Sequence, residues 1–202
     1  VNMGYKRGLD LGALVPPRYE MVLAADADCT SDDPWWDACS MPDERIAHTV
    51  ASWMALNSFE TVSVYVASCD RANKLASMLK KEVEKLGGSA WCEPVHSKNL
   101  SQAVCAARVE KFKDGAFDRV LHKVVVSVRK LVEGFNYKAL QAAVLVDVPS
   151  SAGDVQQVVA RVMRADGVKH EGRVLVFGDT NSIDVFGALK YKFDVKGRVI
   201  RF

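Results

Sequence analysis

Short, valine-rich hydrophobic runs recur along the chain, and most of them are followed by a segment with helical periodicity. Residues 61–67 (TVSVYVA) form the first such run, and apolar side chains then recur at three- and four-residue steps through residues 71–86. Continuous rather than alternating hydrophobicity is typical of strands that are covered on both faces. The pattern therefore predicts an α/β protein with three layers, α/β/α, around a mostly parallel central sheet. Further strands are predicted at residues 90–95, 124–128, 142–148 and 174–177, a further helix at 100–112 and a closing hairpin at 191–202.

Charge is distributed unevenly along the 202 residues, although the formal net charge is only +2. Residues 20–44 contain eight acidic side chains and neither lysine nor arginine, whereas residues 45–202 carry 24 basic and 16 acidic side chains. The basic surplus favours a polyanionic partner. The acidic stretch contains Pro34 and Pro42 and is typical of a solvated loop. We therefore expect residues 1–57 to form a linker and acidic entry segment, and residues 58–202 to form the folded domain.

The composition excludes several classes of protein. With 49% hydrophobic and 26% charged residues, the chain matches globular domains rather than disordered or fibrous proteins. No apolar stretch approaches the ~20 residues of a membrane-spanning helix, so no membrane partner is expected. The five cysteines are odd in number and lack the paired spacing of zinc ligands, which favours reduced thiols in an intracellular protein without a metal site. Because the first residue is a valine, we expect the chain to be part of a longer protein.

The stretch 154–164 (DVQQVVARVMR) combines an apolar stripe with a polar one. On a helix its valines fall on one arc, whereas Gln157, Arg161 and Arg164 fall within roughly 60° on the opposite side. No carboxylate lies within helical reach of Arg161, and planar guanidinium groups with a permanent charge suit a phosphoryl group in transfer. A solvated basic face explains the pattern about equally well. In an open parallel sheet, such a site is expected beyond the carboxyl ends of the strands.

A second polar stretch follows the strand predicted at 124–128. Ser127 lies near the end of that strand, and Glu133, Gly134 and Asn136 come a short turn later. A glycine between two hydrogen-bonding side chains lets the backbone approach a ligand closely, but a helix C-cap at Gly134 is an equally good explanation. The chain contains neither G-x-G-x-x-G nor G-x-x-x-x-G-K-[ST], so another segment would have to hold most of any nucleoside triphosphate.

Together these stretches resemble motifs V and VI of superfamily 2 helicases. The sequences VSVRKLVEGFN, AAVLVDVPSS and QQVVARVMR follow the family pattern of a strand, E-G-F-D, a strand ending in P-x-x-S, and Q-x-x-G-R-x-x-R. This variant is similar to the restriction-enzyme and repair-helicase branch rather than to the DEAD-box branch. Residues 62–79 resemble motif IV, and residues 5–19 (YKRGLDLGALVPPRY) resemble the linker that enters the second RecA-like lobe. The resemblance spans nearly the whole chain.

The resemblance implies that this chain is the C-terminal, RecA-like motor lobe of an ATP-dependent helicase or translocase that acts on DNA or RNA. An upstream N-terminal lobe would hold most of ATP and Mg²⁺, and this lobe alone would be inactive. Arg164 would be the arginine finger, Arg161 its partner on the same phosphate, and Gln157 would position both. The other implied contacts are Glu133, Gly134 and Asn136 at the nucleotide, and Ser68, Arg71, His96, Ser97, Lys98 and Ser127 at the nucleic-acid backbone.

Three departures from the family pattern leave other functions open. Ala160 replaces the usual motif VI glycine, Asn136 replaces the usual aspartate, and Tyr137-Lys138 stands where Val-Pro is usual. The rival function is a degenerate, non-catalytic helicase-like scaffold or binding module. A third is an unrelated α/β enzyme that uses the arginine pair to bind a small phosphorylated substrate.

Overall fold

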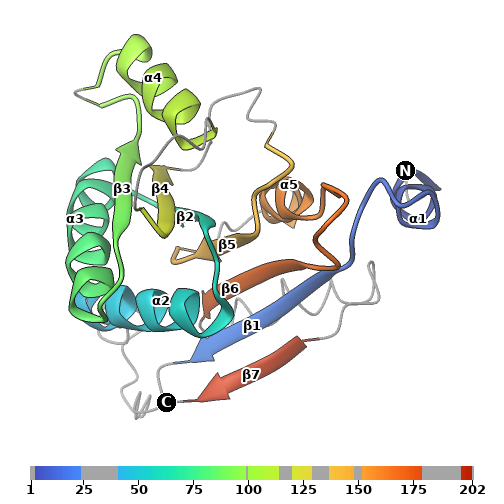
Figure 1. Cartoon of the computed structure of the whole chain (residues 1–202), viewed down its shortest axis with the longest axis horizontal. Helices are drawn as coiled ribbons and strands as arrows, with labels where there is room; N and C mark the ends of the chain where they lie inside the picture. The colour runs from blue at the N-terminus through green and yellow to red at the C-terminus, as the bar shows by residue number, and fades with distance from the viewer. Residues whose placement is uncertain are drawn as a thin grey trace, which may run out of the picture.

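A seven-stranded sheet forms the centre of the computed structural model, which describes residues 3–23, 41–98, 100–113, 120–128, 137–147, 152–178 and 197–201. The strand order is β3-β4-β2-β5-β6-β1-β7, and all the strand pairs within these residues are parallel (Figure 1). The strands are β1 (Pro17–Leu23), β2 (Thr61–Val66), β3 (Ala90–Val95), β4 (His122–Val128), β5 (Ala142–Leu145), β6 (Gly172–Gly178) and β7 (Gly197–Arg201).

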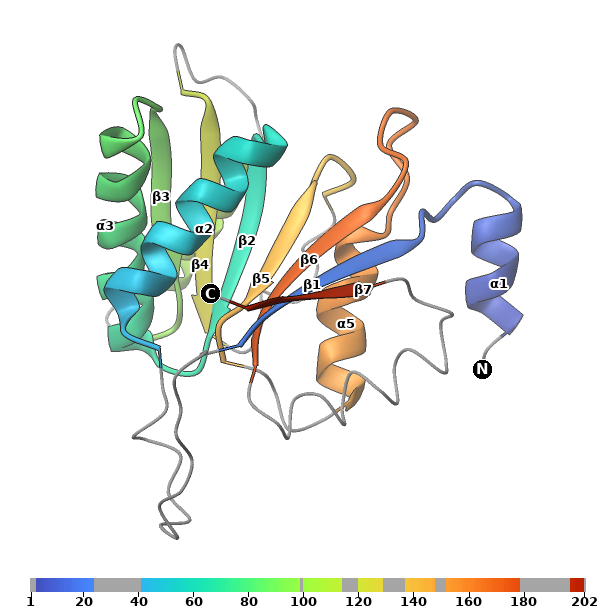
Figure 2. The ribbon, with the colours of Figure 1, turned by 90° about the horizontal axis from the view of Figure 1, so that it is seen from below.

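Helices cover both faces of this sheet (Figure 2). The side chains of β2 show the division, because Val62 and Val64 belong to the hydrophobic core under α2 and α3, whereas Tyr65 belongs to the core under α4 and α5. The predicted three-layer fold with a mostly parallel sheet is therefore confirmed. The helices are α1 (Met3–Asp10), α2 (Asp43–Asn57), α3 (Cys69–Lys85), α4 (Gln102–Lys113) and α5 (Ala152–Val162).

Three elements of the fold, α1, β1 and α2, lie in the segment that was expected to be a linker. Strand β1 pairs with both β6 and β7, and α2 buries Ile46, Val50 and Trp53 at four- and three-residue steps. The folded unit therefore begins before residue 58, the predicted boundary. Arg18 and Glu20 interrupt the hydrophobic pattern of β1, which hides this strand from a search for continuous apolar runs.

Strand β7 pairs in parallel with β1 and forms one edge of the sheet. Its register places Gly197 opposite Tyr19. The hairpin predicted at residues 191–202 would need an antiparallel partner strand before β7, and residues 191–196 lie outside the described part of the chain.

A buried ion pair joins β1, β6 and α2. The carboxylate of Glu20 has no exposed surface, accepts a hydrogen bond from Trp53 Nε1 (3.1 Å) and pairs with the guanidinium of Arg173 near the start of β6. The same guanidinium donates to Asn57 Oδ1 (3.1 Å) and lies 5.9 Å from the centroid of the Phe59 ring. An isolated buried carboxylate would be strongly unfavourable. The cluster therefore fixes where α2 crosses the sheet.

Breaking this buried pair should lower stability much more than breaking an exposed one. Arg173→Met leaves Glu20 buried without its cation, so we expect the free energy of unfolding to fall by about 3–5 kcal/mol. Arg18→Met is the matched control, because Arg18 meets Glu171 at 3.6 Å with both side chains more than a third exposed, and such pairs contribute at most about 1 kcal/mol. Urea denaturation followed by tryptophan fluorescence measures both changes. Similar losses in the two variants would contradict the prediction.

Candidate functional site

The predicted site residues divide between the two edges of the sheet. The loops that follow β2 and β3 lie at the carboxyl edge, where the sequence placed its nucleic-acid contacts. Helix α5 runs back from the end of β5 to the start of β6, as a helix between parallel strands must. Its C-terminal end therefore lies at the amino edge. Arg161 and Arg164 lie there as well, which corrects the prediction that they lie beyond the carboxyl ends of the strands.

The chain leaves the helix before it reaches Arg164. Helix α5 ends at Val162, and Arg164 forms an isolated antiparallel bridge with Leu14. The N–H of Val15 donates to the carbonyl of Met163 (2.6 Å). The stripe predicted for a continuous helix through residue 164 is therefore interrupted, because pairing with the incoming chain replaces the last helical turn. We call residues 163–171 the α5–β6 loop and residues 13–16 the entry strap.

The remaining members of the predicted stripe differ in their surroundings. The side chain of Gln157 is exposed, and that of Arg161 is half-buried. Burial raises the pKa of Tyr65 to about 12, and the positive charge of Arg161 opposes this rise. The charge of Arg161 thus affects the hydroxyl of Tyr65 on β2. The charge of Arg164 affects the ammonium group of Lys169 in the α5–β6 loop.

Lys169 connects the α5–β6 loop to a turn at residues 137–140. Its Nζ donates hydrogen bonds to the carbonyl oxygens of Lys138 and Leu140, both at 2.9 Å. Burial lowers the pKa of Lys169 to about 8, with a further lowering by Arg164 that Asp166 opposes. No motif in the sequence indicates this residue, because a single lysine in a loop has no distinctive spacing.

Asp166 sets the shape of the same loop. Its Oδ1 accepts hydrogen bonds from the backbone N–H groups of Val168 (2.9 Å) and Lys169 (2.8 Å). Burial opposes ionisation of Asp166, but these hydrogen bonds outweigh it and bring the pKa of its carboxyl below the ordinary value. The exposed aspartate therefore stabilises the local turn.

The three residues predicted at the nucleotide, Glu133, Gly134 and Asn136, lie outside the described part of the chain. The next described residue is Tyr137, whose ring packs edge-on against Phe112 of α4 at 5.4 Å between centroids. The turn that begins at Tyr137 precedes β5 and therefore lies at the amino edge, on the same side of the sheet as α4 and α5.

At the carboxyl edge, Arg71 is held by acids from two other elements. Its Nε meets Asp43 Oδ1 at the start of α2 (2.9 Å), and its guanidinium also pairs with Asp147 after β5. Asp147 in turn accepts the N–H of Ala67 (2.6 Å). Ser68 caps α3, because its Oγ accepts the N–H of Arg71 (3.2 Å). The structure therefore brings Ser68 and Arg71 together, in a cluster that joins α2, α3 and β5.

The candidates after β3 form a second group at this edge. Lys98 pairs with Asp70 of α3 at 3.0 Å, and both side chains are largely exposed. Ser97 is exposed, whereas His96 is buried, with its Nε2 3.0 Å from Asn73 Oδ1. These residues lie beside the start of α3, near Ser68.

Ser127 is less accessible than the other predicted contacts. Its hydroxyl has no exposed surface and lies 3.5 Å from the carbonyl of Val64 on the neighbouring strand. The residues that sequence reasoning missed here are mostly acids. The position of Asp147, directly after a buried strand, is a signal in the sequence that could have indicated a site residue. The pairing of Asp43 with Arg71 has no such signal, because it depends on a contact across 28 positions.

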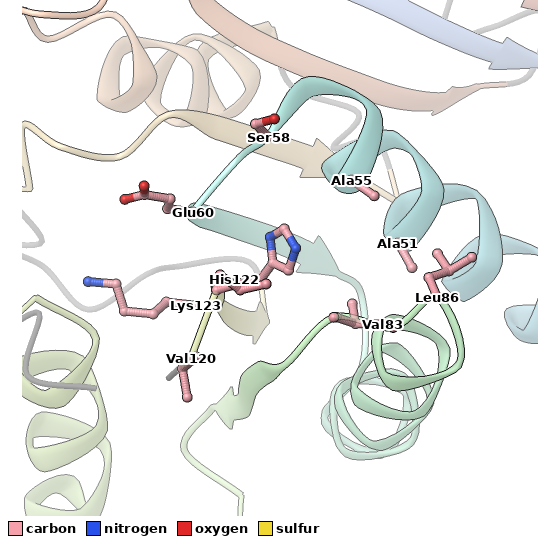
Figure 3. A pocket seen from close by; sticks show the side chains of 12 residues that line it. Ala51, Ala55, Ser58, Glu60, Val83, Leu86, Val120, His122 and Lys123 are labelled. Atoms are coloured by element: carbon pink, nitrogen blue, oxygen red, sulfur yellow. The ribbon is translucent and has the colours of Figure 1, made fainter. Parts of the chain in front are cut away.

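A pocket of about 630 Å³ opens at the amino ends of β2 and β4, between the C-terminal ends of α2 and α3 (Figure 3). The lining includes Ala51 and Ala55 of α2, Val83 of α3, Leu86 directly after α3, and His122 of β4. None of the predicted site residues lines it.

The described residues contain neither a metal-binding cluster nor a membrane-spanning helix. No cluster of three or more histidine, cysteine or acidic side chains there is arranged to hold a metal ion. Within the same ranges, no helix combines the length and hydrophobicity needed to cross a membrane.

Comparison with solved structures shows that the fold is shared with helicase lobes. A fragment assigned as an HsdR subunit of a type I restriction enzyme from Vibrio vulnificus YJ016 matches with a TM-score of 0.74 and 18% identity, over 96% of this chain and 38% of that one. The ATP-dependent Type ISP restriction-modification enzyme LlaBIII bound to DNA matches at 0.68 and 15%, over 98% and 16%. Domain 2 of the DEAD-box helicase Mss116p bound to an RNA duplex matches at 0.63 and 15%, over 91% and 63%. None of the curated protein sequences matches this chain significantly.

A family model for the helicase conserved C-terminal domain matches residues 46–166, more than half of the chain. The chain therefore belongs to the helicase conserved C-terminal domain family. This confirms the resemblance to the second RecA-like lobe of superfamily 2 helicases, with restriction-enzyme and DEAD-box proteins among the structural neighbours. The chain spans less than two thirds of each of the three solved chains.

The environment of Lys169 predicts a pH dependence that can be measured directly. The folded protein releases the Lys169 proton near pH 8, whereas an unfolded lysine keeps its proton to about pH 10.5. The folded protein thus disfavours the charged form of Lys169. Below pH 8, where Lys169 is charged in both states, this effect lowers the free energy of unfolding by its full amount. Between pH 8 and 10.5 the free energy of unfolding should rise relative to that of Lys169→Met. Urea denaturation of both proteins at pH 7 and pH 10 tests the sign, and an NMR titration of the Lys169 Cε with a midpoint near 10.5 would contradict the prediction.

Proposed function

We propose that this chain is the C-terminal motor lobe of an ATP-dependent helicase or translocase, which acts together with an N-terminal lobe. Family membership supports the helicase assignment. The observation that carries the finer proposal is the position of Arg164 at the amino edge, in a loop that is bonded to the turn directly after the E-G-F-N stretch. The turn at residues 137–140 and Arg164 therefore lie at the same edge of the sheet.

In this proposal, Arg164 supplies the positive charge that stabilises the phosphoryl group during transfer. Its guanidinium is always charged, so it needs no proton transfer to act. The chain lacks a phosphate-binding loop, so the N-terminal lobe would hold the phosphates and Mg²⁺. Gly134 and Asn136 would contact the ribose side of the nucleotide, and Glu133 would connect this stretch to motif VI. Arg161, beside Tyr65, would support the position of α5.

The nucleic-acid backbone would bind at the carboxyl edge, near Ser97 and Lys98. Both side chains of the Lys98–Asp70 pair are largely exposed, and exposed pairs contribute little energy, so a phosphate can replace Asp70 at low cost. Arg71 differs, because it is only 24% exposed and pairs with two carboxylates. We therefore assign Lys98 to phosphate binding, and Arg71 to holding the loops after β2 and β5 in place. Such contacts would be independent of base sequence.

Removing the proposed arginine finger should abolish most ATP hydrolysis in the full-length protein. Arg164→Ala should lower kcat by about 10³-fold or more, with little change in KM, since the charge acts mainly on the transition state. Arg45→Ala is the control, because Arg45 is an exposed arginine of α2 away from the α5–β6 loop. Steady-state ATPase assays with saturating single-stranded nucleic acid measure both. Wild-type kcat in Arg164→Ala would refute the assignment.

Charge changes at the carboxyl edge should alter nucleic-acid binding in opposite directions. Lys98→Ala should weaken binding of a labelled oligo(dT) or oligo(U) strand and reduce the slope of log K against log salt by about 0.7. Asp70→Asn should strengthen binding, because it removes the carboxylate that competes for Lys98. Lys81→Ala removes the same charge from a distant, exposed part of α3 and should change affinity least. Fluorescence anisotropy at several salt concentrations measures all four proteins, and equal effects of Lys98→Ala and Lys81→Ala would argue against a specific contact.

The rival function is a non-catalytic helicase-like scaffold. Two observations favour it: Arg71 is already paired with carboxylates, and the hydroxyl of Ser127 is buried. Ala160 does not decide between the two, because its side chain is exposed on α5 and its methyl group meets no obstacle that would displace the helix within this lobe. A full-length protein that binds nucleic acid but shows no nucleic-acid-stimulated ATP hydrolysis would support the scaffold.

A further inference from the structure

We propose that Lys169 is a positioning residue that couples the turn at residues 137–140 to the α5–β6 loop, and thereby fixes the loop that carries Arg164 relative to the start of β5. The inference rests on the proposed function, since it gives Lys169 a role in placing the arginine finger.

The first argument is the geometry of the ammonium group. Lys169 Nζ donates to two carbonyl oxygens, those of Lys138 and Leu140, at 2.9 Å each. These carbonyls belong to a turn that is closed by a hydrogen bond from the N–H of Leu140 to the carbonyl of Tyr137 (3.3 Å). The turn continues into Gln141, whose N–H donates to the carbonyl and the hydroxyl oxygen of Thr61. The position of Lys169 is therefore tied to the start of β5.

The second argument is that the α5–β6 loop is anchored on its other side. The entry strap bonds the loop on both sides of Arg164, through Val15 N–H to Met163 O (2.6 Å) and Ala165 N–H to Ala13 O (3.1 Å). A third bond, from the N–H of Gly172 to the carbonyl of Pro16 (2.9 Å), holds the start of β6. The loop thus lies between the entry strap and the turn. Lys169 supplies the two hydrogen bonds to the turn.

The third argument concerns charge. Asp166 fixes the backbone of Lys169, since its Oδ1 accepts that residue's N–H (2.8 Å). Burial is the main cause that lowers the pKa of the half-buried Lys169; the charge of Asp166 opposes this effect, and the charge of Arg164 adds to it to a smaller extent. A half-buried ammonium group needs compensation, which the two carbonyl dipoles and the charge of Asp166 provide. Lys169 therefore acts as a donor to the backbone rather than as a counter-ion.

The same arrangement explains how a change at the nucleotide could reach the entry strap. A displacement of the turn moves its two carbonyls, and the hydrogen bonds to Nζ transmit the displacement to the α5–β6 loop. The antiparallel pairing at Leu14 and Arg164 then passes it to the chain that enters β1. The hydrogen bonds of the entry strap join backbone atoms, whereas those of Lys169 come from its side chain and can be removed by substituting that residue.

The test uses the full-length protein and three variants, two of which each remove one positive charge. Lys169→Met removes the donors and retains an unbranched apolar side chain, Lys169→Arg retains a positive charge and can donate to both carbonyls, and Lys81→Met removes an exposed lysine of α3. We expect Lys169→Met to lower the kcat of ATP hydrolysis on the order of 10- to 100-fold, as for other small misplacements of reacting groups. KM should stay unchanged, Lys169→Arg should recover part of the loss, and Lys81→Met should match the wild type.

A second readout on the 202-residue chain separates positioning from general destabilisation. Hydrogen exchange of the Leu140, Gln141 and Ala165 amides should accelerate together in Lys169→Met, while the amides of β2 keep their protection. Faster exchange throughout the sheet, or unchanged exchange at Ala165, would overturn the inference. Wild-type kcat in Lys169→Met together with a strong loss in Arg164→Ala would overturn it as well and leave the proposed function intact. Wild-type kcat in Arg164→Ala would instead reject the proposed function.

Discussion

The parallel sheet of this protein is buried on both faces, and this constraint determines where polar chemistry can occur. All six residues of β2 are buried, and the strands beside it supply side chains to one hydrophobic core above the sheet and to another below it. Burial of that much apolar surface is the main source of stability in such folds. Charged groups within these layers need partners, as Glu20 has in Arg173 and Trp53. Loops at the two edges of the sheet are where functional side chains can be placed.

The direction of the connecting helices then assigns different chemistry to each edge. A helix between parallel strands returns the chain from the carboxyl edge to the amino edge, so residues at the two ends of α5 lie on opposite sides of the molecule. Arg164 follows the C-terminal end of α5 and meets the entry strap. Ser68 and Lys98 lie at the carboxyl edge, beside the start of α3. In the proposed motor, the sheet is the rigid body between a nucleotide-facing edge and a nucleic-acid-facing edge.

Ion pairs decide how each candidate residue can act. Arg71 links acids from α2 and from the end of β5, so its charge holds loops together before any ligand arrives. Lys98 has one exposed partner and can exchange it. Lys169 has backbone carbonyls as partners, which hold an ammonium group in place without neutralising it. Three basic residues that look alike in a sequence therefore differ in the cost of moving them toward a phosphate.

Much of the fold could be predicted from the sequence, because valine-rich runs and helical periodicity are local properties. β3 was predicted with its observed bounds, and the predicted strand at β2 ends within one residue of the observed one. Strand β1 was missed, because Arg18 and Glu20 break its pattern, and their ionic partners Glu171 and Arg173 are more than 150 positions away. The helix through residue 164 was also predicted too long. Its last turn is replaced by pairing with Leu14, and periodicity carries no information about such a pairing.

The sequence by itself determined the layers of the fold, the family and the residue types available for phosphate chemistry, since hydrophobic period and motif spacing act over short stretches of chain. Only the tertiary structure decided that Arg164 leaves its helix, that Lys169 joins two loops, and that Arg71 is already paired. These outcomes depend on contacts between segments far apart in the chain. Their energies come from burial and hydrogen-bond geometry, which exist only after the chain has folded.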